Sequence, residues 1–297
     1  IKGYLNCAVL TLDSEGDSSN QTVWISKNDK KILHEMFRSS KCDIARVYTL
    51  TTLLLSMKPH EHEFKVMGLA AYAKSKYAQQ VYEDVFKNLL MVKNCKITHK
   101  NRPRNLYEYL KKNFECHRFD NIAGGLQIFL EKLAVELISQ IYKKTKIKNY
   151  AISGGVSMNI KMNKIISELP FVKKLFVPPS GTDESLSVGA CYYLAKSKSK
   201  PLKNIYLGYN LNEELSYSRL NKTFDKKYFK IYKNINALKI AKLLKSNKVV
   251  AVARGREEFG ARALGNRSIL ANPSNLDCIK EINEAIKNRD FWMPFAL

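Results

Sequence analysis

The sequence predicts an α/β protein with two domains, and three observations support this expectation. The chain has 297 residues, which is enough for two domains of ordinary size. Short apolar segments are repeatedly followed by a loop with glycine or proline and then by a helical segment, which is the pattern of α/β folds. Residues 196–204 read KSKSKPLKN and have the composition of a linker. We therefore expect one domain over residues 1–200 and a second over residues 201–297.

The first part of the chain predicts antiparallel strands followed by helices. Residues 4–37 alternate between apolar and polar side chains and contain the turn-rich segment SEGDSSNQ, which indicates a meander. Residues 74 to about 118 are polar with a helical period, so we expect a peripheral helical insertion there. The next helix should be amphipathic, because apolar residues follow a helical spacing at Leu126, Phe129, Leu130, Leu133, Leu137 and Ile141.

Strand–helix units follow in both expected domains. In the first domain, apolar strands at 148–153 and 172–177 each lead through a loop into a helix. Both loops lie at the carboxyl end of a strand, where open α/β sheets bind ligands. Beyond the linker, a helix at 235–246, a strand at 247–253 and a helix at 276–288 predict a second α/β unit.

Composition narrows the class of protein. No apolar run approaches the roughly 18 residues of a bilayer span, so no membrane association is expected. The six cysteines are scattered without a C-x-x-C pair, which favours reduced thiols in a cytoplasmic protein. The chain begins at Ile1 inside an expected strand and stops without a closing element, so we expect a fragment that lacks both ends.

The charge of the chain has two interpretations. The formal net charge of +23 is compatible with a protein that binds nucleic acid. Only 11 of the 50 basic residues are arginine, however, and the lysines are spread over the whole chain. Diffuse lysine is typical of a solvated surface, whereas binding sites concentrate charge. Nucleic acid is therefore not the expected partner, although a non-catalytic basic protein that binds nucleic acid stays an alternative.

Arginine is concentrated in one segment, GREEFGARALGNRSIL at 255–270. Four of the eleven arginines fall between positions 254 and 267. An arginine fork makes paired hydrogen bonds to phosphate or carboxylate, and glycine lets the backbone turn sharply near a ligand. The alternative is a surface loop whose arginines form ion pairs with Glu257 and Glu258. As an anion site, the segment would act through Arg256, Arg262 and Arg267 and through Gly255, Gly260 and Gly265.

A second glycine segment, SGGVSMN at 153–159, follows an expected strand and opens an expected helix. Paired glycines at such a point expose backbone amides and a helix amino terminus to an anion. We predict that Ser153, Gly154, Gly155 and Asn159 contact a nucleotide phosphate or ribose. The alternative is a tight turn that has no ligand.

Carboxylates and histidines give less specific signals. In the loop PPSGTDES, Asp183 is suited to a metal ion or a nucleotide, but a helix cap through Asp183 or Ser185 is the favoured interpretation from this loop alone. His60 and His62 form an H-x-H pair. No other histidine has a spacing that completes a metal site with them, so surface histidines are the favoured interpretation.

Four segments, taken together and in this order, resemble a known enzyme family. They are HEFKVMGLAAYA, ISGGVSMNIKMN, FVPPSGTDESLSVGA and GREEFGARALGNRSILANP. Over nearly its whole length, the chain resembles the O-carbamoyltransferases of nodulation and antibiotic biosynthesis. The resemblance implies that residues 1–200 are the C-terminal part of an actin-like ATPase-fold (ASKHA) domain that transfers carbamoyl groups, similar to the universal tRNA threonylcarbamoyl-adenosine enzyme. Residues 201–297 would be the N-terminal part of a YrdC-like domain that forms carbamoyl-adenylate.

The resemblance also implies an activity. In that family, the second domain joins carbamoyl phosphate and ATP into carbamoyl-adenylate, and the first transfers the carbamoyl group to a hydroxyl of a sugar or another small molecule. By the resemblance, Arg256, Arg262 and Arg267 bind phosphates during adenylation, and the SGGVSMN segment contacts the adenylate. A tRNA-modifying enzyme of the related threonylcarbamoyl class is the alternative.

A metal site is implied by the resemblance as well. Asp183 matches a carboxylate that, with two histidines of an H-x-x-x-H segment, binds Fe²⁺ or a similar divalent ion, while Mg²⁺ accompanies ATP. This sequence has no H-x-x-x-H segment, which by family order would precede Ile1. Asp183 is therefore expected to be the one metal ligand that this chain supplies.

Overall fold

The computed structural model describes residues 6–296, apart from 27–32, 196–199, 212, 226, 229, 231, 233 and 234. The chain forms two compact units, Ile1–Ser199 and Lys200–Leu297, which we call unit 1 and unit 2. Both contain helices and strands, and the sheet of unit 1 has parallel neighbours. The expected mixed α/β class is therefore confirmed.

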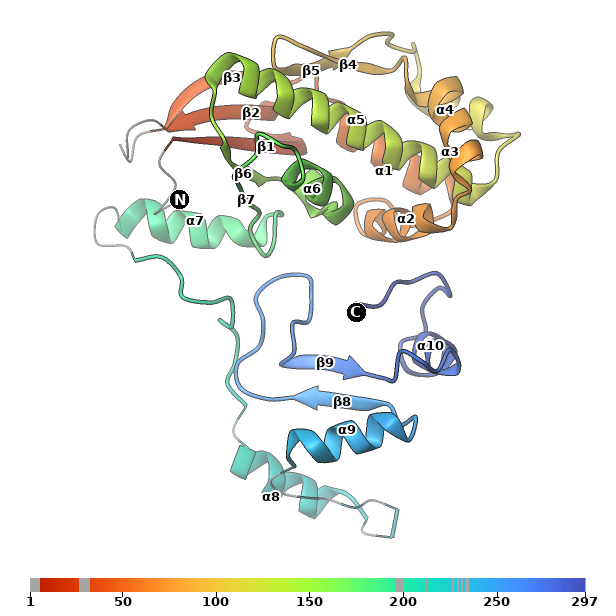
Figure 1. Ribbon diagram of the computed structural model, residues 1–297, viewed down its shortest axis with the longest axis vertical. Helices are drawn as coiled ribbons and strands as arrows, with labels where there is room; N and C mark the ends of the chain where they lie inside the picture. Colours follow the sequence, from red (N-terminus) through yellow and green to blue (C-terminus); the bar gives the residue numbers. More distant parts are fainter. Residues whose placement is uncertain are drawn as a thin grey trace. The chain divides into compact units, whose positions relative to one another are not determined.

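Unit 1 is built around a five-stranded sheet with the order β3-β2-β1-β6-β7 (Figure 1). The strands are β1 (Cys7–Gly16), β2 (Ser19–Ser26), β3 (His34–Ser39), β6 (Asn149–Ser153) and β7 (Lys174–Phe176). β1, β2 and β3 pair antiparallel, as the alternation in the sequence predicts. β6 and β7 extend the sheet in parallel, and Thr11 of β1 lies opposite Ser153 of β6. β6 ends at Ser153, so the turn that follows it begins beside the part of β1 that continues beyond Thr11.

The helices of unit 1 are mostly short. Their bounds are α1 (Ile44–Leu54), α2 (Glu63–Leu69), α3 (Ser75–Val81), α4 (Leu106–Phe114), α5 (Phe119–Thr145), α6 (Ile160–Ser167) and α7 (Glu184–Ala195), with 3-10 turns at Ala70–Tyr72 and Gly155–Met158 and a π turn at Tyr82–Phe86. The six apolar residues predicted to mark one face of α5 are all buried. α3 packs closely against α5, since a Cβ on Gly125 would lie 2.8 Å from the Cβ of Val81.

The prediction of a helical insertion at 74–118 is wrong in its middle. This part of the chain forms a hairpin from β4 (Leu90–Lys93) and β5 (Lys96–His99). β4 alternates buried and exposed side chains, which is the period of a strand. Asn94 and Cys95 both have positive φ, 53° and 63°, as a tight two-residue hairpin turn requires. Because this turn has no glycine, the apolar run before it resembles a continuation of the helix in the sequence.

Unit 2 is smaller and has a two-stranded sheet. Its elements are α8 (Glu213–Thr223), α9 (Ala237–Lys245), β8 (Val250–Ala253), β9 (Arg267–Leu270), α10 (Asp277–Lys280) and a π turn at Glu281–Ile286. The predicted strand and the two predicted helices are confirmed, the second helix as two successive pieces. β9 was not expected, and it pairs antiparallel with β8. The arginine-glycine segment therefore forms the loop and the second strand of a hairpin.

Burial is uneven between the two units. Among the described residues of unit 2, the buried apolar side chains are Cys278, Ile282 and Met293, and the rest of the buried core belongs to unit 1. α7 has no buried residue. None of the helices that the structure describes is long and apolar enough to cross a membrane.

Candidate functional site

The predicted nucleotide segment begins where β6 leaves the sheet of unit 1. Ser153 ends β6 opposite Thr11 of β1, and Gly154 follows with a φ of +94°. A Cβ on Gly154 would lie 2.1 Å from the carbonyl oxygen of Leu12. Only glycine fits here, because both the positive φ and the close approach of the two backbones exclude a side chain.

Asp13 fixes this turn to β1. Its Oδ2 accepts a 2.9 Å hydrogen bond from the backbone N–H of Gly155. The N–H of Gly154 donates to the carbonyl of Gly181 at 2.9 Å, so the loop after β7 meets the turn at the same point. A Cβ on Gly181 would lie 2.1 Å from the Oγ of Ser157, which shows how closely the two loops pack. The amides of both predicted glycines therefore have acceptors within the protein.

Asn159 is buried and connects three helices of unit 1. Its Oδ1 accepts from the N–H of Met162 at 2.9 Å and so caps α6. Its Nδ2 donates to Gln127 of α5 at 2.8 Å, and its Oδ1 accepts from Gln127 Nε2 at 3.0 Å. Tyr48 of α1 is also hydrogen-bonded to Asn159, and burial raises the pKa of this phenol. The helix expected after this segment begins at Ile160, because Asn159 is its cap.

These contacts explain the local backbone of the SGGVSMN segment. The tight-turn interpretation accounts for the positions of Gly154 and Gly155, and the cap accounts for Asn159. The Oγ of Ser157 is buried and has no hydrogen-bond partner among the described residues. Contact of Ser153, Gly154, Gly155 and Asn159 with a nucleotide stays a prediction.

Asp183 lies exposed at the end of the loop that precedes α7. Its side chain makes no hydrogen bond with a described residue, and the Oγ of Ser185 donates to the carbonyl of Thr182, so neither side chain caps α7 by accepting from its amides. Glu184 instead accepts hydrogen bonds from the hydroxyls of Thr182 and Ser180, and these, chiefly the one from Thr182, lower its pKa. The favoured capping interpretation is therefore wrong.

His60 and His62 do not form a metal site with other described residues. His60 donates from its N–H to Glu63 at 2.7 Å, and Nδ1 of His62 accepts from the N–H of Lys58 at 3.1 Å, as is typical of residues that lead into a helix. Within the described ranges, no three His, Cys, Asp or Glu side chains gather as a metal site. A metal ion on Asp183 stays a prediction.

In unit 2, the arginine-glycine segment turns at its three predicted glycines. Gly255, Gly260 and Gly265 have φ values of 51°, 118° and 106°. Residues with a Cβ rarely adopt the values of Gly260 and Gly265, so the path of the loop depends on glycine at these two positions. The expected backbone freedom of the segment is present, and contact of the three glycines with a ligand stays a prediction.

Two of the three predicted arginines bind the backbone of their own unit. Arg256 donates from Nε to the carbonyl of Gly208 and from Nη2 to the carbonyl of Leu207, each at 3.0 Å. Arg267 donates from Nη1 to the carbonyls of Arg254 and Asn266, at 2.8 and 3.0 Å. A planar guanidinium suits two carbonyls at once, whereas a lysine ammonium is a point charge. Arg256 and Arg267 therefore stabilise the loop.

The two acidic residues of the loop behave differently. Glu257 lies 3.5 Å from Nε of Arg267, which is the ion pair of the surface-loop interpretation. Oε1 of Glu258 accepts from the N–H groups of Leu264 and Asn266, each at 2.7 Å, and from that of Arg267 at 3.3 Å. Desolvation opposes ionisation of Glu258, but these backbone donors outweigh it and lower its pKa to about 2. The ionised carboxylate of Glu258 thus stabilises the loop through these hydrogen bonds.

Arg262 is the third predicted arginine, and it differs from the other two. It is exposed and makes no hydrogen bond or ion pair with any residue that the structure describes. Its guanidinium is therefore available to a ligand without breaking a contact of the loop. The sequence alone does not distinguish the three arginines. In the structure, Arg256 and Arg267 bind the backbone, whereas Arg262 is exposed to solvent.

Sequence reasoning missed the groups that position these segments. Asp13 was not expected to contact Gly155, because a single sequence does not show which strands are neighbours in the sheet. The contact of Gly181 was missed for the same reason, since its carbonyl accepts from the N–H of Gly154 in another loop. Glu258 was considered only as an ion-pair partner of the arginines, and its hydrogen bonds to the backbone of its own loop were not expected. The one signal for Asp13 is its place at the end of an apolar, alternating segment.

Comparison with known families agrees with this division into two units. A model described as "Carbamoyltransferase N-terminus" matches residues 4–192, and one described as "Carbamoyltransferase C-terminus" matches residues 241–297. The first match covers more than half of the chain and lies within unit 1, and the second lies within unit 2. The chain belongs to the carbamoyltransferase family.

Individual relatives support the same family. An uncharacterized protein of Methanocaldococcus jannaschii is 31% identical over 97% of this chain and 51% of its own length. Nodulation protein NolO of Bradyrhizobium diazoefficiens is 26% identical over 79% of this chain and 44% of its own length. Nodulation protein U of Sinorhizobium fredii is 29% identical over 60% of this chain and 31% of its own length. The chain spans about half the length of the curated relatives it matches, or less.

Proposed function

We propose that the protein is an O-carbamoyltransferase that forms carbamoyl-adenylate from carbamoyl phosphate and ATP. It then transfers the carbamoyl group to a hydroxyl of a sugar or another small molecule. In this proposal, unit 1 is part of an actin-like ATPase-fold domain that carries out the transfer, and unit 2 is part of a YrdC-like domain that forms the adenylate. Membership of the carbamoyltransferase family supports the identity of the transferred group.

One observation supports a two-step reaction more than any other. The two glycine segments lie in different compact units, and each lies inside the stretch that matches one part of the carbamoyltransferase family. Each segment leaves a strand at its carboxyl end and turns at a glycine with positive φ. Two separate sites suit an activation step followed by a transfer step.

For the activation step, Arg262 is the residue we assign to phosphate. Its exposed guanidinium would make paired hydrogen bonds to phosphate oxygens and offset the negative charge of carbamoyl phosphate or ATP. Arg256 and Arg267 contribute indirectly, because their bonds to backbone carbonyls fix the loop that carries Arg262. The carboxylate of Glu258 supports the same loop by accepting hydrogen bonds from the backbone N–H groups of Leu264 and Asn266.

The transfer step follows from the chemistry of a carbamoyl-adenylate. The acceptor hydroxyl oxygen attacks the carbamoyl carbon, the carbon–oxygen bond to the adenylate phosphate breaks, and AMP leaves with the electron pair while the hydroxyl proton is released. The Gly154 turn is the place we assign to the adenylate, since it lies at the carboxyl end of a parallel strand.

The described residues supply only part of a divalent metal site. Asp183 is an exposed carboxylate of the kind that binds Fe²⁺, but the described residues bring no histidine pair to it. No step is therefore assigned to that ion. Mg²⁺ would accompany ATP and neutralise part of its phosphate charge.

The proposal is tested with purified full-length protein, radiolabelled carbamoyl phosphate and ATP. We expect labelled carbamoyl-adenylate to form only when ATP is present, and addition of a mixed sugar pool to move the label onto sugar. Transfer to total tRNA in place of sugar would favour the threonylcarbamoyl alternative. Absence of the adenylate, together with nucleic-acid binding that weakens steeply with salt, would favour the basic binding protein.

A further inference from the structure

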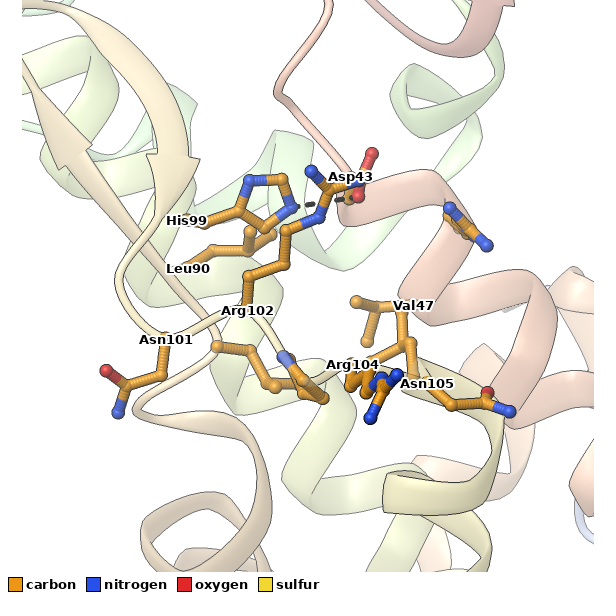
Figure 2. Close-up of a pocket in the computed structure, with 12 residues that line it drawn as sticks. Asp43, Val47, Leu90, His99, Asn101, Arg102, Arg104 and Asn105 are labelled. Carbon is orange, nitrogen blue, oxygen red and sulfur yellow. Dashed lines mark hydrogen bonds and ion pairs between the residues drawn. The ribbon is translucent and has the colours of Figure 1, made fainter.

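Unit 1 contains a cavity of about 320 Å³ that is lined by residues outside the SGGVSMN segment. It lies between the start of α1, the β4–β5 hairpin and the loop before α4 (Figure 2). Val47, Leu90 and Leu106 give it apolar walls, and the side chains of Asn101 and Asn105 add amide groups. Small-molecule sites commonly measure about 300–1,000 Å³ and combine apolar walls with a few polar groups.

Three arginines line this cavity: Arg46, Arg102 and Arg104. In the part of the chain that the structure describes, none of the three makes a hydrogen bond or an ion pair, and all are exposed. Figure 2 shows Arg102 extending toward Asp43 and His99, while Arg104 lies beside Val47 and Asn105. Three like charges at one cavity repel each other, so an anion bound among them would be stabilised.

The one acidic side chain that lines the cavity is already engaged. Oδ2 of Asp43 lies 2.9 Å from Nε2 of His99, and both side chains are about four-fifths buried. Asp43 is therefore hydrogen-bonded to His99, and one carboxylate does not offset three guanidinium groups. α4 begins at the same cavity, and its cap Asn105 uses Oδ1 to accept from the N–H of Tyr107. The amino end of a helix adds to the positive potential.

The choice of arginine is informative in this chain. Lysines outnumber arginines by 39 to 11, yet the cavity has three arginines and no lysine among its lining residues. A surface that only needs charge would carry lysine, as most of this chain does. A guanidinium fork instead matches the oxygens of a phosphate group, and it makes two parallel hydrogen bonds.

We propose that this cavity binds the phosphate group of a small phosphorylated molecule that also carries hydroxyl groups, such as a sugar phosphate. Arg102 and Arg104 bind the phosphate oxygens, Arg46 adds charge, and the amides of Asn101 and Asn105 bind hydroxyl groups. The volume accommodates such a molecule but not an enclosed polynucleotide. The inference rests on unit 1 alone and does not depend on carbamoyl transfer.

Isothermal titration calorimetry with the full-length protein tests this site. The probes are glucose 6-phosphate and ribose 5-phosphate, compared with glucose, ribose and inorganic phosphate. We expect at least one sugar phosphate to bind more tightly than either inorganic phosphate or the parent sugar. The double variant Arg102→Ala/Arg104→Ala should lose affinity by at least about tenfold, since each lost fork removes charge-assisted hydrogen bonds.

Two further variants separate geometry from charge. Arg102→Lys/Arg104→Lys keeps both charges and should lose an intermediate amount of affinity, because the paired hydrogen bonds are lost. Arg38→Ala/Arg219→Ala removes two exposed arginines elsewhere and should bind within about twofold of the unmodified protein. Circular dichroism melting of each variant verifies that the fold is retained. If the Arg102→Ala/Arg104→Ala protein does not fold, the loss of affinity in Arg102→Lys/Arg104→Lys tests the site instead.

The proposal is overturned if neither sugar phosphate binds, if inorganic phosphate binds as tightly as both, or if the Arg102→Ala/Arg104→Ala protein binds unchanged. Single-stranded RNA binding that is lost in this variant, without sugar phosphate binding, would also overturn it and would assign the surface to a polynucleotide. Carbamoyl-adenylate formation should be the same in all three double variants. Failure of this site is therefore distinguishable from failure of the proposed function.

Discussion

Asp13 and Gly155 are joined by a 2.9 Å hydrogen bond, although 142 residues separate them along the chain. The bond forms because β1 and β6 are parallel neighbours, with Thr11 opposite Ser153. It fixes the turn that follows β6 to a residue of β1 that lies beyond the last pair of these two strands. The position of the proposed adenylate site therefore depends on the sheet of unit 1 and not on its own loop alone.

Replacement of Gly154 by alanine should destabilise unit 1. The new Cβ would lie 2.1 Å from the carbonyl oxygen of Leu12, and the φ of +94° is unfavourable for any residue with a Cβ. We expect the free energy of unfolding to fall by about 2–4 kcal/mol. Urea unfolding followed by circular dichroism measures the change.

Gly189→Ala is the matched control for this prediction. Gly189 lies in α7, and a Cβ built there meets nothing within 4 Å. Alanine favours a helix over glycine by about 1 kcal/mol, so this change should leave stability equal or slightly higher. Equal destabilisation by both changes would show that the close approach at Gly154 is not the cause.

Glu258 should make the arginine-glycine loop sensitive to acid. Its pKa is lowered from an ordinary 4.5 to about 2, so the folded loop binds fewer protons than the unfolded loop between these values. The stabilisation is therefore complete above pH 4.5 and is lost as the pH falls toward 2. Hydrogen exchange of the peptide with Leu264 and Asn266, corrected for the intrinsic rate, should show protection falling over this range.

In Glu258→Gln, the same peptide should be less protected at neutral pH and should show little further change down to the folded pKa of about 2. Glu284→Gln, which removes an exposed carboxylate elsewhere in unit 2, should keep the profile of the unmodified protein. A profile in Glu258→Gln that still falls as in the unmodified protein would assign the acid sensitivity to another group.

Arg267→Lys should lower the stability of unit 2. The guanidinium binds the carbonyls of Arg254 and Asn266, and lysine cannot serve both with the same geometry. We expect a loss of about 1–2 kcal/mol in the free energy of unfolding. Thermal melting followed by the fluorescence of Trp292 reports on this unit, in a protein in which Trp24 is replaced by phenylalanine. An unchanged melt would show that these hydrogen bonds do not stabilise the loop.

The cysteines should react in an order set by burial. Cys116 and Cys191 are exposed, whereas Cys7 and Cys42 are buried, which raises their pKa values to about 11 and about 12. Because the thiolate is the reactive form, iodoacetamide near neutral pH should label the first two and spare the second two. Mass spectrometry of digests reads the labels, and labelling in urea is the control. Early labelling of Cys42 would contradict the buried position.

Much of the fold follows from local pattern. The apolar spacing of α5 is a property of neighbouring residues, and its buried face is the predicted one. The alternation of residues 4–37 likewise predicts β1 to β3. The β4–β5 hairpin was missed because its turn residues, Asn94 and Cys95, lack the glycine that normally signals such a turn.

The sites depended on contacts that local pattern does not contain. The spacing of arginines and glycines identified the loop in unit 2, but not that Arg256 and Arg267 bind its backbone while Arg262 is open. The role of Asp13 required knowledge of strand order. The cavity lined by Arg102 and Arg104 could not be predicted, because the β4–β5 hairpin that forms part of its wall was itself missed.

The central claim is that the loop at Arg262 binds a phosphate-bearing substrate during carbamoyl-adenylate formation. The most direct test is the rate of labelled carbamoyl-adenylate formation by full-length Arg262→Lys protein. The account predicts a rate roughly 10- to 100-fold lower, with thermal unfolding unchanged, because the exposed side chain supports nothing in the loop. An unchanged rate in the variant, or no adenylate from the unmodified protein, would contradict it.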